Sequence, residues 1–196
     1  MTGAVPGPDG SPRCPWGLGP PVYTAYHDQE WGRPLHGEAA LFERISLEAF
    51  QAGLSWLTIL RKRDAFRAAF GGFDPQVVAG FDADDEARLL ADAGIVRNRA
   101  KVSATIANAR AVLALPEPLS DLLWSFAPTE PGPVPRTLAE VPAVTPASTA
   151  MAKTLRARGF RFVGPTTAYA LMQAAGMVND HVAGCAYRDC GPAGGG

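Results

Sequence analysis

The chain has 196 residues, 47% of them hydrophobic, and its 18 basic and 19 acidic residues give a formal net charge of −1 at pH 7. This length is sufficient for one domain with a buried core, or for two small lobes around a cleft. No uninterrupted run of about 18 apolar residues occurs, which excludes a membrane-spanning helix. The near-neutral charge means that binding to nucleic acid would require a basic face, because the molecule as a whole has no positive field.

The two ends of the chain and its cysteines carry separate signals. Residues 1–12 are rich in proline and glycine and lack the features of a signal peptide, so we expect a disordered leader and a cytoplasmic protein. Residues 188–196 are expected to form a flexible tail. The three cysteines, Cys14, Cys185 and Cys190, are an odd number, which favours thiols or metal ligands over a disulfide framework.

The body of the chain predicts an all-α fold, because no alternating run is long enough for a sheet. Residues 14–34 are expected to be irregular and aromatic-rich, and residues 127–146, with six prolines, to be a surface connection. Capping residues and apolar periodicity predict a series of helices. They run over Glu38–Ala52, Ser55–Phe70, a short helix that opens at Asp74 and Pro75, Asp84–Ala91, Asn98–Leu115, Leu119–Phe126, Ala147–Arg158 and Pro165–Ala175.

The stretch from Glu48 to Trp56 is the strongest candidate for a functional site. Glu48 lies in an apolar helical run, where a carboxylate costs free energy unless another group compensates it. With Trp56 as a stacking face, and Leu54 after the bend at Gly53 as a wedge for a base stack, the stretch can receive a flat, electron-poor ring. The alternative is a helix that ends at Gly53, with a solvated glutamate and a core tryptophan.

A glycine-containing turn joins the last two predicted helices. Gly159 can end the first helix in a left-handed conformation, and Val163, Gly164 and Pro165 can begin the second with outward-facing backbone N–H groups. Such a turn can hold one DNA phosphate without reading sequence. Turns of this kind also serve as plain structural connections.

Four residues near the two ends of the chain are candidate zinc ligands. Cys14 and His27 form one pair and His181 and Cys185 the other, and thiolate with imidazole is a ligand set that zinc binds tetrahedrally. An ion held by both pairs would join the N-terminal and C-terminal segments. The spacing is unlike a common zinc finger, so that Cys190 in place of Cys185, or unliganded side chains, remain alternatives.

The string from Phe162 to Ala168 resembles the hairpin of the helix–hairpin–helix DNA glycosylase superfamily. Thr166 stands where the bifunctional members carry a Schiff-base lysine, so a lyase step through that residue is not available. Asn179 falls where the superfamily usually has its catalytic aspartate. The usual carboxylate is therefore missing or moved.

From Cys14 to about Tyr187 the chain is similar to the DNA-3-methyladenine glycosylase I family. The matching strings are Arg13 to Trp16, Tyr23 to Gly32, Leu47 to Trp56, Asp92 to Ile95, Trp124 to Phe126, Gly159 to Gly164 and Val178 to His181. The resemblance implies a single helix–hairpin–helix glycosylase domain over residues 13–187, with two helical lobes around a cleft. It also implies a monomeric, monofunctional enzyme of base excision repair, which acts in the cytoplasm at the bacterial nucleoid.

The substrate and the site residues follow from the same resemblance. The substrate would be double-stranded DNA containing 3-methyladenine, from which the enzyme hydrolyses the N-glycosidic bond to release the free base. Glu48 would be the catalytic residue, in a base pocket formed by Trp16, Tyr23, Tyr26, Glu48 and Trp56. DNA would be contacted by Gly53, Leu54, Gly159, Val163, Gly164 and Thr166. A structural zinc ion would bind Cys14, His27, His181 and Cys185.

The chemistry implied by this resemblance is coherent. An adenine methylated at N3 is a cation and a good leaving group, so an acidic pocket with aromatic walls can select it by charge and stacking. Neutral damaged bases should be poor substrates, because they leave Glu48 uncompensated. Two rival interpretations are a catalytically silent lesion-binding protein and a zinc-stabilised helical scaffold whose aromatic residues are all core.

Overall fold

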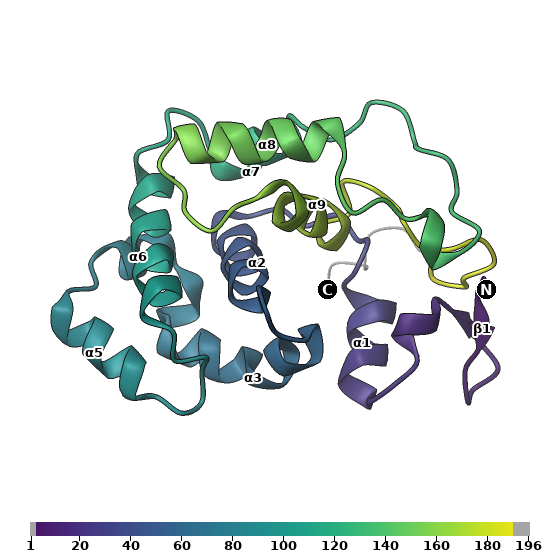
Figure 1. Ribbon diagram of the computed structural model, residues 1–196, viewed down its shortest axis with the longest axis horizontal. Helices are drawn as coiled ribbons and strands as arrows, with labels where there is room; N and C mark the ends of the chain where they lie inside the picture. The colour runs from purple at the N-terminus through teal and green to yellow at the C-terminus, as the bar shows by residue number, and fades with distance from the viewer. Residues whose placement is uncertain (1–2, 190–196) are drawn as a thin grey trace.

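The computed structural model describes residues 3–189 and is built mainly of helices arranged around α2 (Figure 1). The α-helices are α1 (Pro21–Gln29), α2 (Glu38–Gln51), α3 (Trp56–Ala69), α4 (Pro75–Ala79), α5 (Ala83–Ala91), α6 (Arg99–Leu113), α7 (Leu119–Trp124), α8 (Pro146–Ala157) and α9 (Pro165–Ala174). The described residues also contain three 3-10 turns and two short strands. The turns are η1 (Pro15–Gly17), η2 (Gly71–Phe73) and η3 (Leu138–Glu140), and the strands are β1 (Val5–Pro6) and β2 (Pro12–Arg13). The prediction of a mainly helical protein is confirmed.

Helix α2 is the centre of the molecule. It contacts α3, α6, α7 and α9, and every residue from Leu41 to Phe50 except Glu43 is buried. Figure 1 shows α2 and α9 in the middle, with α3, α5 and α6 on one side and α1 with β1 on the other. An acidic residue on the buried length of α2 must therefore face either the core or a cavity.

Local sequence signals locate most helix ends correctly. Ser55 caps α3 by accepting a hydrogen bond from the Thr58 backbone N–H, and Asp74 caps α4 in the same way from Gln76. The observed bounds of the remaining predicted helices differ from the prediction by one or two residues. Helix ends are set by short-range capping, which is why the sequence locates them well.

Residues 14–34 are not irregular as predicted, because they contain η1 and α1. Prolines occupy the N-cap and the first position of α1, where the missing N–H is not needed and the fixed φ favours the helix. Pro20 and Pro21 therefore begin a helix in this stretch. Contacts between α1 and α3, which the sequence does not reveal, stabilise the helix.

The predicted disordered leader is also wrong over part of its length. Strands β1 and β2 pair antiparallel, with Val5 opposite Arg13. The buried Arg13 guanidinium binds the carboxylates of Asp9 at 2.6 Å and Asp28 at 2.8 Å, which ties the hairpin to α1. Residues 1–2, and the expected tail from residue 190 onward, lie outside the described residues.

The proline-rich segment, residues 127–146, is more than a surface connection. The Pro135 carbonyl accepts a hydrogen bond from the Ala183 N–H at 2.7 Å, which joins the segment to the C-terminal part of the chain. Leu138, Val141 and Pro142 line a cavity beside α2.

None of the helices in residues 3–189 combines the length and hydrophobicity that a bilayer crossing requires.

Candidate active site

A cavity of about 400 Å³ opens beside α2, between the N-terminal aromatic residues and α9. All five residues predicted to contact a base line it: Trp16, Tyr23, Tyr26, Glu48 and Trp56. The cavity is also lined by residues that we did not predict: Trp31, Gln51, Leu138, Val141, Pro142, Ala143, Ala170, Gln173 and Asp180. The fold therefore brings together side chains that are up to 164 residues apart in the chain.

Glu48 is the acidic residue that α2 contributes to this cavity. Its side chain is buried, and burial raises the pKa of its carboxyl group from 4.5 to about 7, although the nearby Arg44 opposes the shift. None of residues 3–189 donates a hydrogen bond to the Glu48 carboxylate. The carboxylate is therefore available to a ligand in the cavity that brings positive charge or hydrogen-bond donors.

Arg44, one helical turn before Glu48, is the buried cation beneath the cavity. Its guanidinium donates to the Tyr26 hydroxyl at 3.1 Å and to Glu30 at 3.3 Å, and it lies 5.2 Å from the centre of the Tyr26 ring. Arg63 forms a second, bidentate ion pair with Glu30 at 2.6 and 2.9 Å. Glu30 is shared between Arg44 and Arg63, so its single negative charge does not fully compensate the Arg44 cation. Arg44 can therefore also stabilise the ionised form of Glu48.

The aromatic walls are held by contacts with one another. The Trp16 ring lies 5.9 Å from Tyr23, 6.3 Å from Tyr26 and 4.9 Å from Trp31, and Tyr26 lies 5.4 Å from Trp56, all as tilted or edge-on pairs. Edge-on pairs leave ring faces available for a flat ligand. The Trp56 indole N–H is buried and finds no acceptor within residues 3–189.

Asp180 is the site residue that our sequence reasoning missed. It lines the cavity, and its Oδ2 accepts hydrogen bonds from the Tyr169 hydroxyl at 2.6 Å and from the Gln173 amide at 2.8 Å. Asn179 is the residue that the sequence comparison aligns with the usual catalytic aspartate of the superfamily. It is exposed, and its side-chain amide donates to the Arg188 carbonyl. The carboxylate next in sequence is thus the one that faces the cavity with Glu48.

The predicted wedge lies on the turn after α2. Gly53 has a left-handed backbone (φ +81°) and Leu54 is 41% exposed. The Leu54 N–H donates to the Gln51 carbonyl at 2.6 Å, which closes the turn. Leu54 is thus exposed at the end of a tight turn, three residues after Gln51 of the cavity wall.

The predicted phosphate-binding turn joins α8 to α9. Gly159 is left-handed (φ +92°), Gly164 is the N-cap of α9, and Thr166 is exposed in its first turn. The Val163 side chain is buried, so the predicted contact could use only its backbone. Asn108 of α6 holds the turn, accepting from the Arg161 N–H at 2.7 Å and donating to the Arg161 carbonyl at 3.1 Å.

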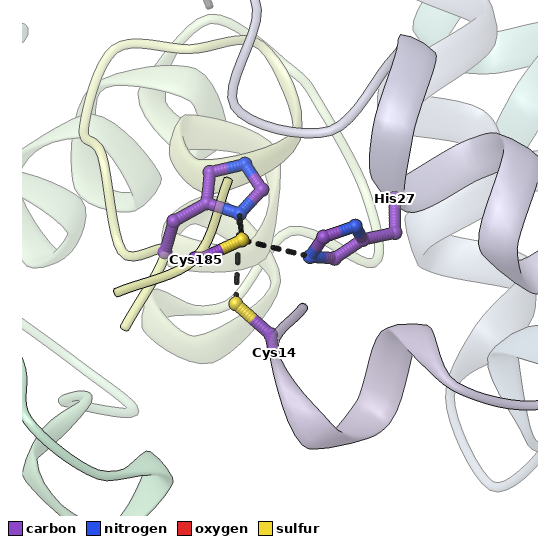
Figure 2. A group of neighbouring side chains, drawn as sticks. Cys14, His27 and Cys185 are labelled. Atoms are coloured by element: carbon purple, nitrogen blue, oxygen red, sulfur yellow. Dashed lines mark hydrogen bonds between the residues drawn. The ribbon is translucent and has the colours of Figure 1, made fainter. Parts of the chain in front are cut away.

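The four predicted zinc ligands, Cys14, His27, His181 and Cys185, form one buried cluster. Their ligand atoms all lie within 4.8 Å of one another. Figure 2 shows Cys14 and His27, from the N-terminal part of the chain, facing Cys185 from the C-terminal part. Cys185 lies in this cluster, whereas Cys190 is outside the described residues.

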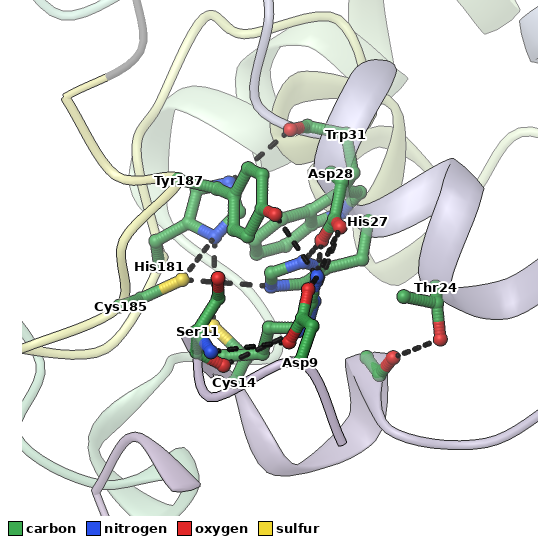
Figure 3. Close-up of polar contacts among 12 residues, drawn as sticks. Asp9, Ser11, Cys14, Thr24, His27, Asp28, Trp31, His181, Cys185 and Tyr187 are labelled. Atoms are coloured by element: carbon green, nitrogen blue, oxygen red, sulfur yellow. Dashed lines mark hydrogen bonds and ion pairs between the residues drawn. The ribbon is translucent and has the colours of Figure 1, made fainter. Parts of the chain in front are cut away.

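The surroundings of the two histidines suit metal binding. His27 Nδ1 donates to the Asp28 carboxylate at 2.7 Å, which directs Nε2 toward the Cys185 sulfur at 3.6 Å. His181 Nε2 donates to the Trp31 carbonyl at 3.2 Å, which directs Nδ1 toward the same sulfur at 3.4 Å (Figure 3). Ligating histidines commonly have their second nitrogen held in this way, so the residues present fit a zinc ion.

The comparisons with known proteins agree with this geometry. A family model described as methyladenine glycosylase matches residues 16–189. The chain is 51% identical, over 88% of its own length and 95% of the other, to a protein from Escherichia coli (strain K12) named DNA-3-methyladenine glycosylase 1. It is 48% identical to a crystal structure of 3-methyladenine DNA glycosylase I, with a TM-score of 0.86 and coverage of 92% and 100%.

A second solved structure concerns recognition of the base. It describes the structural basis of 3-methyladenine recognition by 3-methyladenine DNA glycosylase I from Staphylococcus aureus. The chain is 35% identical to it, with a TM-score of 0.86, over 93% of this chain and 98% of the other. The residues that match the family model, 16–189, include the cavity residues, the turn after α2 and three members of the cysteine–histidine cluster, His27, His181 and Cys185.

Proposed function

The chain belongs to the methyladenine glycosylase family, and on this premise we propose that it excises 3-methyladenine from DNA by hydrolysing the N-glycosidic bond. This is the first step of base excision repair of an alkylated adenine. The single observation that carries the proposal is the buried Glu48 carboxylate, with no hydrogen-bond partner in residues 3–189, in a cavity walled by aromatic rings.

Charge complementarity explains the choice of substrate. Methylation at N3 makes the purine a cation while it is attached to the sugar, and the base leaves as a neutral ring. A cationic ring in the cavity lowers the pKa of Glu48 and compensates its carboxylate. Trp16, Tyr23, Tyr26 and Trp56 supply the faces and edges that enclose the ring. A neutral purine offers no such compensation.

The leaving base needs little further activation by the enzyme, because the glycosidic bond to a cationic base is already weak. Glu48 would orient the ring by accepting hydrogen bonds from it, and the closed aromatic walls would exclude bulk water from the base. Water completes the hydrolysis. Since Thr166 offers no amine for a Schiff base, the reaction is expected to be monofunctional.

The DNA contacts follow from the two turns. Leu54, exposed after Gly53, would fill the space that the extruded nucleotide leaves in the stack. The turn from Gly159 to Gly164 and the first turn of α9 with Thr166 would hold the phosphate backbone through N–H groups. Together they would grip double-stranded DNA at both sides of the cavity.

We assign the cysteine–histidine cluster a structural zinc ion held by Cys14, His27, His181 and Cys185. The ion would supply a cross-link between the two ends of the chain, and no step of the reaction requires it. The metal ligands are adjacent in sequence to cavity residues, since Tyr26 precedes His27 and Asp180 precedes His181.

The remaining properties are proposals at the level of the whole protein. We propose one domain over residues 13–187, in which two helical lobes enclose the cleft, and a monomeric enzyme. The relatives are bacterial and the substrate is chromosomal DNA, so we place the protein in the cytoplasm at the nucleoid.

Release of free 3-methyladenine from methylated double-stranded DNA tests the proposal. The parent protein should liberate the base, whereas Glu48→Ala should reduce the rate by about 10- to 100-fold, as expected from the loss of a charge-assisted hydrogen bond. Chromatography of the released bases measures both rates. A duplex containing hypoxanthine, a neutral damaged purine, should be a poor substrate.

The same assay separates the rival interpretations. A silent lesion-binding protein would retain methylated DNA without releasing the base, and a scaffold would do neither. Equal rates for the parent and Glu48→Ala, with an unchanged fold by circular dichroism, would remove Glu48 from the mechanism.

A further inference from the structure

Lys101 is a buried lysine on α6 whose amino group is directed to the end of α2. Its residue is 7% exposed, and its Nζ donates to the Phe50 carbonyl at 2.9 Å and to the Ala52 carbonyl at 2.6 Å. Among residues 3–189 these carbonyls are its only side-chain partners, so no acidic residue shares the site. The base-excision chemistry described above makes no use of this residue.

The two carbonyls belong to the tight turn that carries Leu54. Ala52 has φ −49° and ψ 115°, Gly53 has φ +81°, and the Leu54 N–H donates to the Gln51 carbonyl at 2.6 Å. These values define a type II β-turn with Ala52 and Gly53 at its two central positions. In the alternative type I turn the peptide between these residues is flipped, so that the Ala52 carbonyl points to the opposite side.

The Lys101 ammonium group therefore selects between the two turn types. It binds the Ala52 carbonyl, which is the group that changes direction between the two turn types. It also binds the Phe50 carbonyl, which receives no backbone N–H from the residue four positions later because α2 has ended. A cation is favoured at the C-terminal end of a helix by the helix dipole. The lysine and the type II turn thus stabilise each other.

The turn connects both functional parts of the site. Gln51, at its first position, lines the cavity, and Leu54, at its last, is 41% exposed. A β-carbon placed on Gly53 would meet no heavy atom within 4 Å, so space alone does not fix the path of the chain here. By binding two carbonyls of this segment, Lys101 ties the turn to α6 and so fixes where the turn holds Leu54.

We propose that Lys101 is a positioning residue for base flipping, which holds the turn from Gln51 to Leu54 in the conformation that presents Leu54 to the base stack. The inference rests on the proposed function, because it assigns Leu54 the role of the wedge. It predicts that loss of the lysine impairs extrusion of a paired base more than recognition of a base that is already free.

Paired and mispaired lesions provide the test. A 3-methyladenine opposite thymine must be unpaired before it enters the cavity, whereas the same lesion opposite cytosine is easier to extrude. Lys101→Met keeps the length of the side chain and removes its donors. It should lower kcat/KM on the paired duplex about tenfold more than on the mispaired duplex, because the wedge offsets the cost of unstacking and unpairing.

Binding of free 3-methyladenine, followed by tryptophan fluorescence, should stay within about twofold of the parent value, since Lys101 does not line the cavity. Lys101→Arg retains a cation with several donors and should recover most of the activity on the paired duplex. Leu54→Ala should show the same preference for the mispaired duplex as Lys101→Met.

Two further variants separate positioning from general stability. Lys62 on α3 makes a similar pair of hydrogen bonds at a less buried position, donating to the carbonyls of Ala93 at 2.9 Å and Gly94 at 3.1 Å. Lys62→Met should leave the ratio of the two duplex activities unchanged. Gly53→Ala introduces no clash but disfavours the left-handed backbone, and it should reproduce the altered ratio with Lys101 intact.

The outcomes distinguish the two proposals. A parent protein that releases no base from either duplex overturns the proposed function. A parent that acts on both duplexes, with a Lys101→Met variant whose activities fall by the same factor on each, overturns the positioning role alone. If Lys101→Met is too unstable to purify, an unchanged ratio for Gly53→Ala overturns the positioning role, because the conformation of the turn then has no effect on base flipping.

Discussion

Burial of the Glu48 carboxylate in the cavity lowers the free energy of unfolding of the protein. Its pKa in the folded protein is about 7 against 4.5 for an exposed group, because burial disfavours the ionised form. Below pH 4.5 both states carry the proton and there is no cost. The cost grows between pH 4.5 and 7, where only the folded protein holds the proton, and it is fully present above pH 7.

Glu48→Gln should therefore stabilise the free protein in a pH-dependent way. The neutral amide removes a cost of roughly 3 kcal/mol at pH 8 and almost none at pH 4.5, taking about 1.4 kcal/mol for each pKa unit. Urea unfolding of the parent and the variant at the two pH values measures the difference. A gain of the same size at both pH values would mean that the charge of Glu48 is not what destabilises the parent.

At the scale of elements, two turns between helices are each held by one polar side chain from α6. Lys101 holds the turn after α2, and Asn108 holds the turn between α8 and α9 through both backbone groups of Arg161. Phe162, the next residue, is left-handed (φ +57°) and 45% exposed, a conformation that a bulky residue adopts only when its surroundings impose it. One face of α6 thus orders both turns that we assign to DNA.

Asn108→Ala should weaken DNA binding without affecting the base pocket. It leaves the N–H and carbonyl of Arg161 without their partner, so we expect a loss of about 2 kcal/mol in the free energy of unfolding and a looser turn. Affinity for a duplex with an abasic-site analogue, measured by fluorescence anisotropy, should fall several-fold. Asn108→Asp, which keeps the acceptor for the Arg161 N–H, should lie between the parent and Asn108→Ala.

Free 3-methyladenine binding should be unchanged in both Asn108 variants. A fall in that affinity equal to the fall in DNA affinity would show that the turn and the cavity are not separable elements.

At the scale of the whole molecule, the cysteine–histidine cluster joins the two ends of the chain directly behind the cavity. The His181 ring donates to the carbonyl of Trp31, a cavity residue, and Tyr26 and Asp180 are sequence neighbours of the proposed metal ligands His27 and His181. An ion in the cluster would therefore support the cavity walls as well as the fold.

Cys14→Ser should lower metal content and stability together. We expect about one zinc per parent chain, much less in the variant, and a loss of several kcal/mol in stability, because metal binding contributes directly to folding. Metal analysis with thermal unfolding, before and after a chelator, measures both quantities. Cys190→Ser should retain the metal; loss of metal there, with retention in Cys185→Ser, would place Cys190 in the ligand set.

The sequence by itself determined what depends on neighbours along the chain. Helix periodicity, the caps at Ser55 and Asp74 and the bend at Gly53 act within a few residues, so the α-helices other than α1 are predicted nearly to their ends. Glu48 stood out because a carboxylate in an apolar run is costly wherever the run is buried. The matching strings added the family, and with it the expectation of the four zinc ligands and of the aromatic wall.

Only the tertiary structure decided the features that depend on contacts between distant residues. The N-terminal hairpin exists because Arg13 reaches Asp28, and Asp180 faces the cavity because Tyr169 and Gln173 hold it there. The proline-rich segment becomes a cavity wall because Leu138, Val141, Pro142 and Ala143 line the same cavity as residues of α2 and α9. Periodicity and capping carry no information about such pairings, because the free energy that selects them arises only when the whole chain is folded.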